Sequence, residues 1–270
     1  ISSRASEAYT RQAAHPRDKV AMLAGGGAGH EPAFSGLVGS GLVTVAVSGD
    51  VFASPSSKQI CSGVDLAPTD KGIVTIVLNY TGDCLNFGLA SEKARSAFHS
   101  EGKGRDIEMV NVGDDVSVGR SKGGLVGRRG LTGAAFTAKV LGAASEKGDD
   151  VQKIAHLGRT MVKNFVTVGS SLDHCHVPGR STDPKERGAL SQSAVEIGMG
   201  IHNEPGAKHI ENKPSGEDLI KEMLELLLRE DDPERSFVKF NKDDDPVLII
   251  NNLGGMSSIE LGAIAAEART

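Results

Sequence analysis

Apolar runs that alternate with helical patterns restrict the fold of this 270-residue chain more than any other feature. The runs have the length of buried strands and cover residues 20–23, 42–47, 73–78 and 107–112. Helical spacing of apolar residues occupies 85–98, 132–146 and 151–164. Strands buried on both faces and separated by helices are typical of parallel sheets. The sequence therefore predicts an α/β fold with mostly parallel sheets and helices on both faces.

Two subdomains are expected, and the polar stretch 178–188, with two prolines, is the best candidate for their boundary. The first subdomain would cover 19–177 and the second 189–270. We expect strand-rich stretches at 165–172 and 195–201, a loop at 119–130, a helix at 219–228 that begins near Ser215, and a buried strand at 247–250. Ser257 and Glu260 then have the spacing of a capping box, which indicates a final helix. Because the chain opens at Ile1 and stops soon after that helix begins, we expect residues 1–18 to be a poorly structured or truncated segment and the fold to be truncated at both ends.

Composition excludes several classes of function. The net charge of −5, the absence of Trp and the presence of only two Tyr argue against nucleic acid as a partner. The three cysteines (Cys61, Cys84 and Cys175) lack CxxC spacing, which favours reduced thiols in a cytoplasmic protein. No apolar run approaches the roughly 18 residues of a membrane span. A small-molecule partner is therefore the expectation.

A glycine run at 25–29, ending in His30, directly follows the first apolar run. It is not a Walker A loop, because no Gly-Lys-Ser/Thr follows, and it lacks the acidic partner of a dinucleotide-binding fingerprint. A cradle for a phosphate or polyol and a purely structural turn both remain compatible with the loop. His30 favours function because it ends the loop where its imidazole can face a ligand, although it could instead hydrogen-bond Glu31.

Two further polar residues follow apolar runs. Asp83 comes shortly after the run 73–78, and ligands of parallel sheets bind outside the carboxyl ends of strands. It could accept hydrogen bonds, act as a base or cap the next helix. His202 lies among glycines with Glu204 nearby to orient it, so it could be a base, a metal ligand or a nucleophile. The pair His174 and His176 lacks a convincing third ligand, so we expect no metal there.

Seven segments together identify a family resemblance. They are MLAGGGAGHEPAFSGLVGSGL, GDVFASPSSKQI, NYTGDCLNFGLASEKAR, VGDDVSVGRSKGGLVGRRGLTG, GSSLDHCHVPGR, MGIHNEPG and INNLGG. In this order, from about Lys19 to about Glu260, they resemble the substrate-binding K-type domain of dihydroxyacetone (glycerone) kinases. The resemblance is closest to the single-chain ATP-dependent form of fungi and other eukaryotes, which includes the triokinases.

The resemblance implies roles for named residues. His202 would attack the ketone carbon and form a covalent hemiaminal, while His30 and Asp83 would handle protons. The residues that would line the substrate site are Gly27, Ala28, Gly29, His30, Leu78 and Asp83. Two of them depart from the family pattern: Leu78 stands where the family usually carries a lysine on the floor of the site, and Ala28 replaces the usual serine.

The resemblance also implies partners. The substrate would be dihydroxyacetone or glyceraldehyde, and the domain would form a homodimer. ATP and Mg²⁺ would bind to a separate helical domain that this chain lacks, so the chain alone would bind substrate without phosphorylating it. Leu78 keeps a second hypothesis open, a catalytically decayed relative that acts as a regulator. A third hypothesis, a metal-dependent hydrolase using the same residues, predicts a tightly bound metal.

Overall fold

The computed structural model describes residues 8–11, 15–100, 102, 105–124, 126–177, 179, 181, 183 and 189–269. Contacts divide the chain into two compact units. Unit 1 comprises Ile1–Asp114 and Arg129–Phe165, and unit 2 comprises Asp115–Arg128 and Val166–Thr270. The chain passes between the units three times, so this division differs from a single boundary at 178–188, most of which lies outside the described residues.

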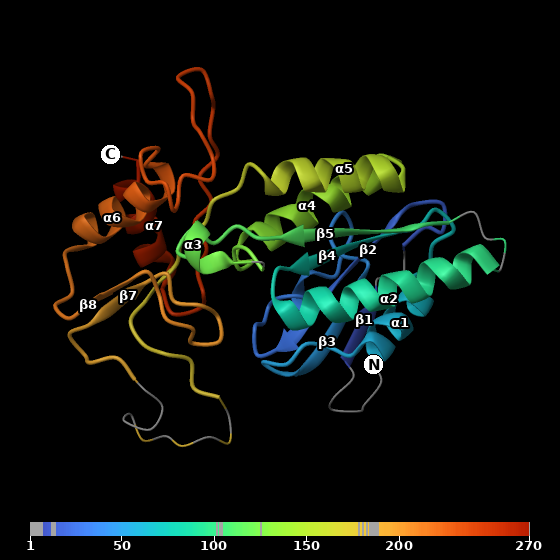
Figure 1. The fold of residues 1–270 in the computed structure, drawn as a ribbon, viewed down its shortest axis with the longest axis horizontal. Coiled ribbons are helices and arrows are strands. Elements are labelled where there is room, and N and C mark those ends of the chain that lie inside the picture. Colours follow the sequence, from blue (N-terminus) through green and yellow to red (C-terminus); the bar gives the residue numbers. More distant parts are fainter. Residues whose placement is uncertain are drawn as a thin grey trace. The chain divides into compact units, whose positions relative to one another are not determined.

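A five-stranded sheet forms the centre of unit 1, in the order β1-β3-β2-β4-β5 (Figure 1). The strands are β1 (Ala8–Arg11), β2 (Ala21–Ala28), β3 (Val45–Val51), β4 (Ile73–Leu78) and β5 (Ile107–Val112). β3, β2, β4 and β5 run parallel, and β1 pairs antiparallel with β3. The predicted bounds of β4 and β5 are confirmed to the residue. Ala8–Arg11 is a strand, contrary to the expectation of a poorly structured start, because the exposed edge of β3 offers it backbone partners.

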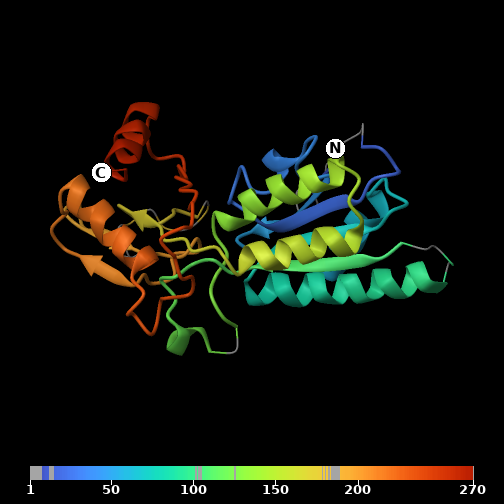
Figure 2. The ribbon, with the colours of Figure 1, turned by 90° about the horizontal axis from the view of Figure 1, so that it is seen from above.

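Two helix pairs cover opposite faces of this sheet (Figure 2). The pair on one face is α1 (Ser57–Leu66) and α2 (Thr81–Ser100), and the pair on the other is α4 (Gly133–Glu146) and α5 (Val151–Val162). Leu23, Ile73 and Phe87 are fully buried in the cluster between the sheet and the first pair. The parallel sheet with helices on both faces confirms the predicted α/β class. α1 was not expected, although its capping box of Ser56 and Gln59 is visible in the sequence.

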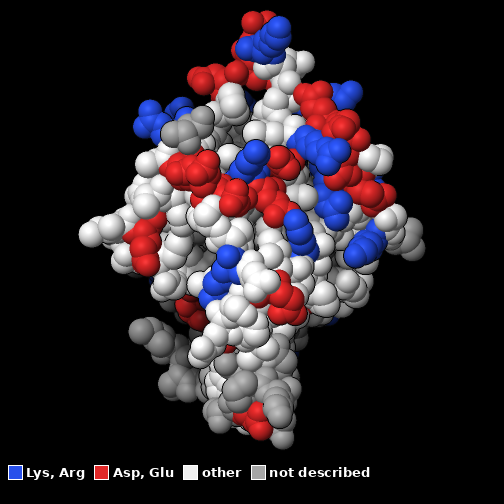
Figure 3. Space-filling model, turned by 90° about the vertical axis from the view of Figure 1, so that its left-hand side faces the viewer, with Lys and Arg blue, Asp and Glu red and all other residues white. Residues whose placement is uncertain are grey.

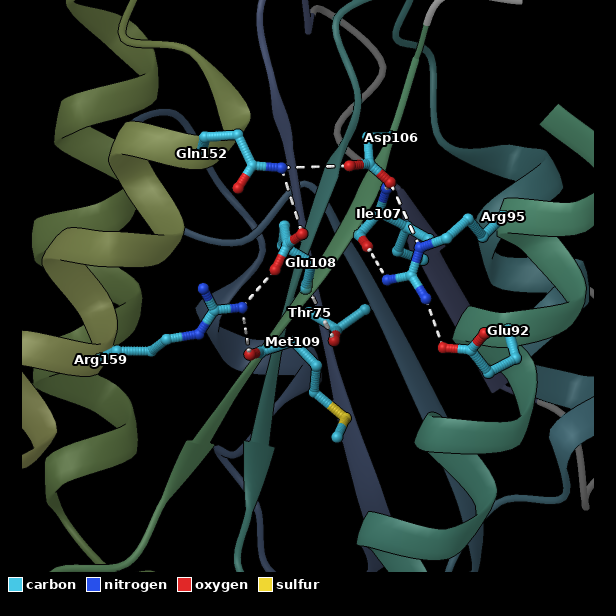
Figure 4. Close-up of polar contacts among 9 residues, drawn as sticks. All are labelled: Thr75, Glu92, Arg95, Asp106, Ile107, Glu108, Met109, Gln152 and Arg159. Atoms are coloured by element: carbon cyan, nitrogen blue, oxygen red, sulfur yellow. Dashed lines mark hydrogen bonds and ion pairs between the residues drawn. The ribbon is translucent and has the colours of Figure 1, made fainter. Parts of the chain in front are cut away.

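Polar contacts tie both helix layers to β5, which is an edge strand (Figure 4). Arg95 of α2 donates to the carbonyl oxygen of Ile107 at 2.6 Å. Arg159 of α5 donates to the carbonyl oxygen of Met109 at 3.4 Å and pairs with the carboxylate of Glu108. One side chain from each layer therefore reaches the same strand.

Unit 2 contains a small antiparallel sheet and three helices. The strands are β6 (Ser170–Ser171), β7 (Val195–Ile197) and β8 (Lys208–Ile210), in that order in the sheet. The helices are α3 (Arg120–Gly123), α6 (Gly216–Leu228) and α7 (Ser258–Glu267). Val116 and Ile197 are buried against Leu219 and Met223 of α6. A short connection joins β7 to β8, which suits antiparallel pairing, whereas parallel strands need a long crossover.

Helix starts were predicted better than strands in this unit. Ser215 accepts a hydrogen bond from the Asp218 N–H, and Ser257 forms the predicted capping box with Glu260. The prediction of a buried strand at 247–250 is wrong: the structure assigns no strand there, and Val247 is 77% exposed. A run of four apolar residues identifies a strand only where a neighbour pairs with it. β6 and β7 are also shorter than expected, and α3 lies within the stretch predicted to be a loop. None of the described helices is both long and apolar enough to cross a membrane.

Candidate functional site

The glycine run brings the end of β2 close to the backbone of β3. A Cβ atom added at Gly25 would lie 2.2 Å from the carbonyl oxygen of Val47, and one at Gly27 would lie 2.7 Å from the amide nitrogen of Ala53. Gly29 has a φ of +93°, which favours glycine. The close approach of the backbone and the positive φ therefore explain why these positions are glycine. Gly26 has no such close contact: an added Cβ atom would lie 4.0 Å from the carboxylate oxygen Oδ2 of Asp83.

His30 follows β2 by two residues and is partly exposed. Its ring stacks on that of Phe52, with centroids 4.8 Å apart and an interplanar angle of 5°. The Glu31 carboxylate accepts hydrogen bonds from the Gly29 N–H at 3.0 and 3.2 Å. An aromatic neighbour thus holds the imidazole, and sequence reasoning missed Phe52 because its contact with His30 depends on how the chain turns after β3.

Asp83 lies in the first turn of α2 and is only 6% exposed. Because α2 begins at Thr81, Asp83 lies inside the helix, so the alternative that Asp83 caps this helix is wrong. A carboxylate near a helix N-terminus is favoured by the helix dipole. Burial and the neighbouring Asp83 raise the pKa of the Cys84 thiol, which lies 3.3 Å from Asn79 Oδ1. A buried acid beside a glycine backbone is a strong candidate for ligand binding.

Leu78, the last residue of β4, is 7% exposed. A Cβ atom added at Gly130 would lie 2.6 Å from Leu78 Cδ2, so the leucine packs directly against the Gly130 backbone. The end of β4 is therefore apolar at Leu78.

His202 belongs to unit 2, and Glu204 orients it as the sequence suggested. Glu204 Oε1 lies 3.0 Å from His202 Nδ1, and Oε2 accepts from the His202 backbone N–H at 2.9 Å. Burial raises the pKa of Glu204, but hydrogen bonds from the His202 side chain and backbone outweigh it and lower the pKa to about 2. Glu204 is therefore ionised at neutral pH, and an anion beside Nδ1 favours the tautomer that keeps a proton there and leaves Nε2 as the basic nitrogen.

Three residues that sequence reasoning missed hold the His202 loop. Asn203 has a φ of +64°, and its side chain bonds the backbone of Cys175 twice, at 2.7 and 3.0 Å. Ser117 Oγ donates to the carbonyl oxygen of Gly198 at 3.1 Å. The buried carboxylate of Glu196 accepts from the Gly206 N–H. These contacts fix the loop at both ends and beside the histidine. Of the three residues, Asn203 could have been noticed in the sequence, because asparagine tolerates a positive φ.

His174, one of the two histidines considered as metal ligands, lies near a carboxylate. Its Nε2 lies 3.8 Å from the Glu196 carboxylate. Among the residues whose positions are described, no group of three or more His, Cys, Asp or Glu could hold a metal ion. Charged side chains on the face shown in Figure 3 are of both signs and interspersed, so this face does not single out a polyanion as partner.

The structure brings some of the predicted residues together. Within unit 1, the glycine run, His30, Leu78 and Asp83 all lie at or just beyond the carboxyl ends of the adjacent strands β2 and β4. His202 and Glu204 form a separate pair in unit 2.

Comparisons with known proteins identify the family. A family model for the Dak1 domain matches residues 2–270. A dihydroxyacetone kinase of Pichia angusta is 46% identical over 257 residues, which are 92% of this chain and 41% of that protein. The crystal structure of the dihydroxyacetone kinase of C. freundii has a TM-score of 0.83 at 33% identity and covers 99% of this chain and 45% of that one. The dihydroxyacetone kinase operon co-activator Dha-DhaQ has a TM-score of 0.78 at 27% identity and covers 94% of this chain and 73% of that one.

This chain spans less than half the length of the two kinases that it matches. The match to the family model nevertheless covers almost every residue, and the fold agrees with that of the bacterial kinase. The chain therefore belongs to the Dak1 domain family.

Proposed function

We propose that this chain is the substrate-binding domain of a dihydroxyacetone (glycerone) kinase, which holds dihydroxyacetone or glyceraldehyde for phosphoryl transfer from ATP. The observation that carries the proposal is the oriented pair of His202 and Glu204, since it gives a nucleophilic nitrogen to a family whose members are named for a ketone substrate. ATP, Mg²⁺ and the helical domain that would bind them belong to the same proposal, as does a homodimer.

The proposed role of His202 is covalent. Nε2 adds to the carbonyl carbon, the π electrons of the C=O bond move to the oxygen, and that oxygen takes up a proton. The imidazolium formed by the addition loses its Nδ1 proton, so the neutral hemiaminal contains no net extra proton. Glu204 beside Nδ1 stabilises the transient positive charge. Glycerol has no carbonyl group and cannot form this bond, so the step would select short ketoses and aldehydes over simple polyols.

His30 and Asp83 have the proposed role of binding the substrate hydroxyls and handling their proton. Asp83 is buried, so its carboxylate is shielded from water and available to a substrate hydroxyl. Gly26 lets a small ligand approach this carboxylate, because it places no side chain beside Oδ2. Holding the terminal hydroxyl in one orientation supplies much of what phosphoryl transfer requires.

Intact mass spectrometry under denaturing conditions, after the adduct formed with dihydroxyacetone has been trapped, tests the covalent role. We expect a mass increase of one ligand molecule in the wild type and its loss in His202→Ala. His209→Ala is the matched control, since His209 is an exposed histidine of the same unit, and it should keep the adduct. Asp83→Asn should bind the ligand more weakly. If the wild type neither gains mass nor is thermally stabilised by dihydroxyacetone, the proposed function is wrong.

A regulatory ligand-binding protein is the second candidate. Leu78 favours it, because a buried leucine at the end of β4 supplies no charge to a phosphorylation site, and the similar co-activator shows that this fold also occurs in a regulator. The full protein supplied with ATP and Mg²⁺ distinguishes the two. Phosphorylation of dihydroxyacetone supports the kinase, whereas an adduct without turnover supports the regulator.

A further inference from the structure

Phe52 adopts a backbone conformation that aromatic residues rarely adopt. Its φ is +54°, and among the described residues only Asn203 shares a positive φ without being glycine. Asparagine tolerates this region, whereas a bulky side chain there is strained. Strained residues of this kind persist only where the surrounding structure holds them, and they are concentrated at functional sites. The conformation of Phe52 therefore needs a reason.

The surroundings of Phe52 hold the strained turn in place. Its N–H donates to the carbonyl oxygen of Ala28 at 2.9 Å, and the N–H of Ala53 donates to that of Asp50 at 3.1 Å. A Cβ atom added at Gly29 would lie 2.7 Å from Cε1 of the Phe52 ring. The glycine run at the end of β2 thus leaves room for this ring.

The turn directs the Phe52 ring to His30. The two rings are nearly parallel, at 5°, with centroids 4.8 Å apart. β2 and β3 are neighbouring parallel strands, so the residues just after their ends lie side by side. Stacking covers one face of the imidazole and restricts its rotation, while both ring nitrogens remain at the edge, where hydrogen bonds form.

We propose that Phe52 is a positioning residue for His30: its strained turn after β3 and its stacked ring fix the imidazole in the orientation that binds a substrate hydroxyl. This inference rests on the proposed function, because it assigns His30 a ligand. Phe52 acts through His30, and its effect is on ligand binding more than on folding. A residue that only filled space could be replaced by leucine without loss of binding.

Three variants test the inference: Phe52→Leu, which keeps apolar volume, Phe52→Tyr, which keeps the ring, and Phe136→Leu as a matched control. Phe136 is an aromatic residue of the same unit whose ring packs against that of Phe165. The first readout is the NMR chemical shift of the His30 ring protons, since a stacked ring moves them upfield. We expect Phe52→Leu to lose this shift, and Phe52→Tyr and Phe136→Leu to keep it.

The second readout is the dissociation constant for dihydroxyacetone. Loss of one aromatic stack should weaken binding by roughly three- to tenfold in Phe52→Leu, with recovery in Phe52→Tyr. Unchanged affinity and an unchanged His30 spectrum in a folded Phe52→Leu variant would overturn the inference and leave the proposed function standing. If the wild type binds no dihydroxyacetone, the proposed function fails, and the substrate role of Phe52 fails with it.

Discussion

Neighbouring glycines in β2 should respond oppositely to the same substitution. In Gly25→Ala the new methyl group would lie 2.2 Å from the carbonyl oxygen of Val47, and that carbonyl belongs to the register partner of Gly25 in the parallel ladder. Neither strand can move without breaking ladder hydrogen bonds, so we expect overpacking at the upper end of about 1–3 kcal/mol. The loss of unfolded-state entropy on replacing glycine returns about 0.4–1 kcal/mol. The net effect is a destabilisation of about 2 kcal/mol.

Gly26→Ala is the matched variant, one residue further along the strand. Its methyl group would lie 3.5 Å from the Phe34 ring, which is ordinary van der Waals contact, so only the entropy gain remains and folding should be stabilised by about 0.4–1 kcal/mol. The same methyl group points towards Asp83 and should weaken ligand binding instead. Urea unfolding measures the difference: at about 2 kcal/mol per molar, the midpoint of Gly25→Ala should fall by about 1 M. Equal midpoints for the two variants would refute the close packing of β2 on β3.

Two further predictions concern carboxylates. The pKa of Glu204 is about 2 in the folded chain and 4.5 ordinarily, so its stabilisation is full above about pH 4.5 and lost as the pH falls towards 2. The side chain is 35% exposed, so solvent screening reduces its contribution to the free energy of unfolding to about 1 kcal/mol. The difference in this free energy between the wild type and Glu204→Gln should disappear at pH 2, and a difference that persists there would contradict the prediction. Asp114 accepts from the N–H groups of Leu131 and Gly133 at 2.7 and 2.8 Å, so Asp114→Ala should cost about 2 kcal/mol. Hydrogen exchange at both amides should accelerate, and protection equal to that of the wild type would show that the carboxylate is not needed.

The fold was predictable where local pattern and long-range pairing agree. β4 is six consecutive buried residues, and its apolar run has parallel neighbours on both sides. The run 247–250 is equally apolar but forms no strand. The prediction failed there because the composition of a segment does not show whether another strand is available to pair with it. The segment 115–128 belongs to unit 2 although the residues on both sides of it belong to unit 1, and a linear division of the sequence cannot represent that exchange.

Contacts in the site were likewise predictable only where the two residues are close in sequence. The contact of Glu204 with His202 spans two residues, so sequence proximity was enough to suggest it. The stack of Phe52 on His30 spans 22 residues and requires a positive φ in an aromatic residue, which propensities argue against. The burial of Asp83 likewise depends on packing around the start of α2, which the spacing of residues along the chain does not reveal.

The arginines beside β5 have a consequence for self-association. An edge strand presents outward carbonyl groups that another chain can use to extend the sheet, which is a common start of aggregation. Here Arg95 and Arg159 occupy the carbonyl oxygens of Ile107 and Met109. An incoming strand would have to displace both guanidinium groups from these carbonyl oxygens, while Arg95 is also held by Glu92 and Asp106 and Arg159 by Glu108. We therefore expect that copies of this chain do not join into a continuous sheet through β5.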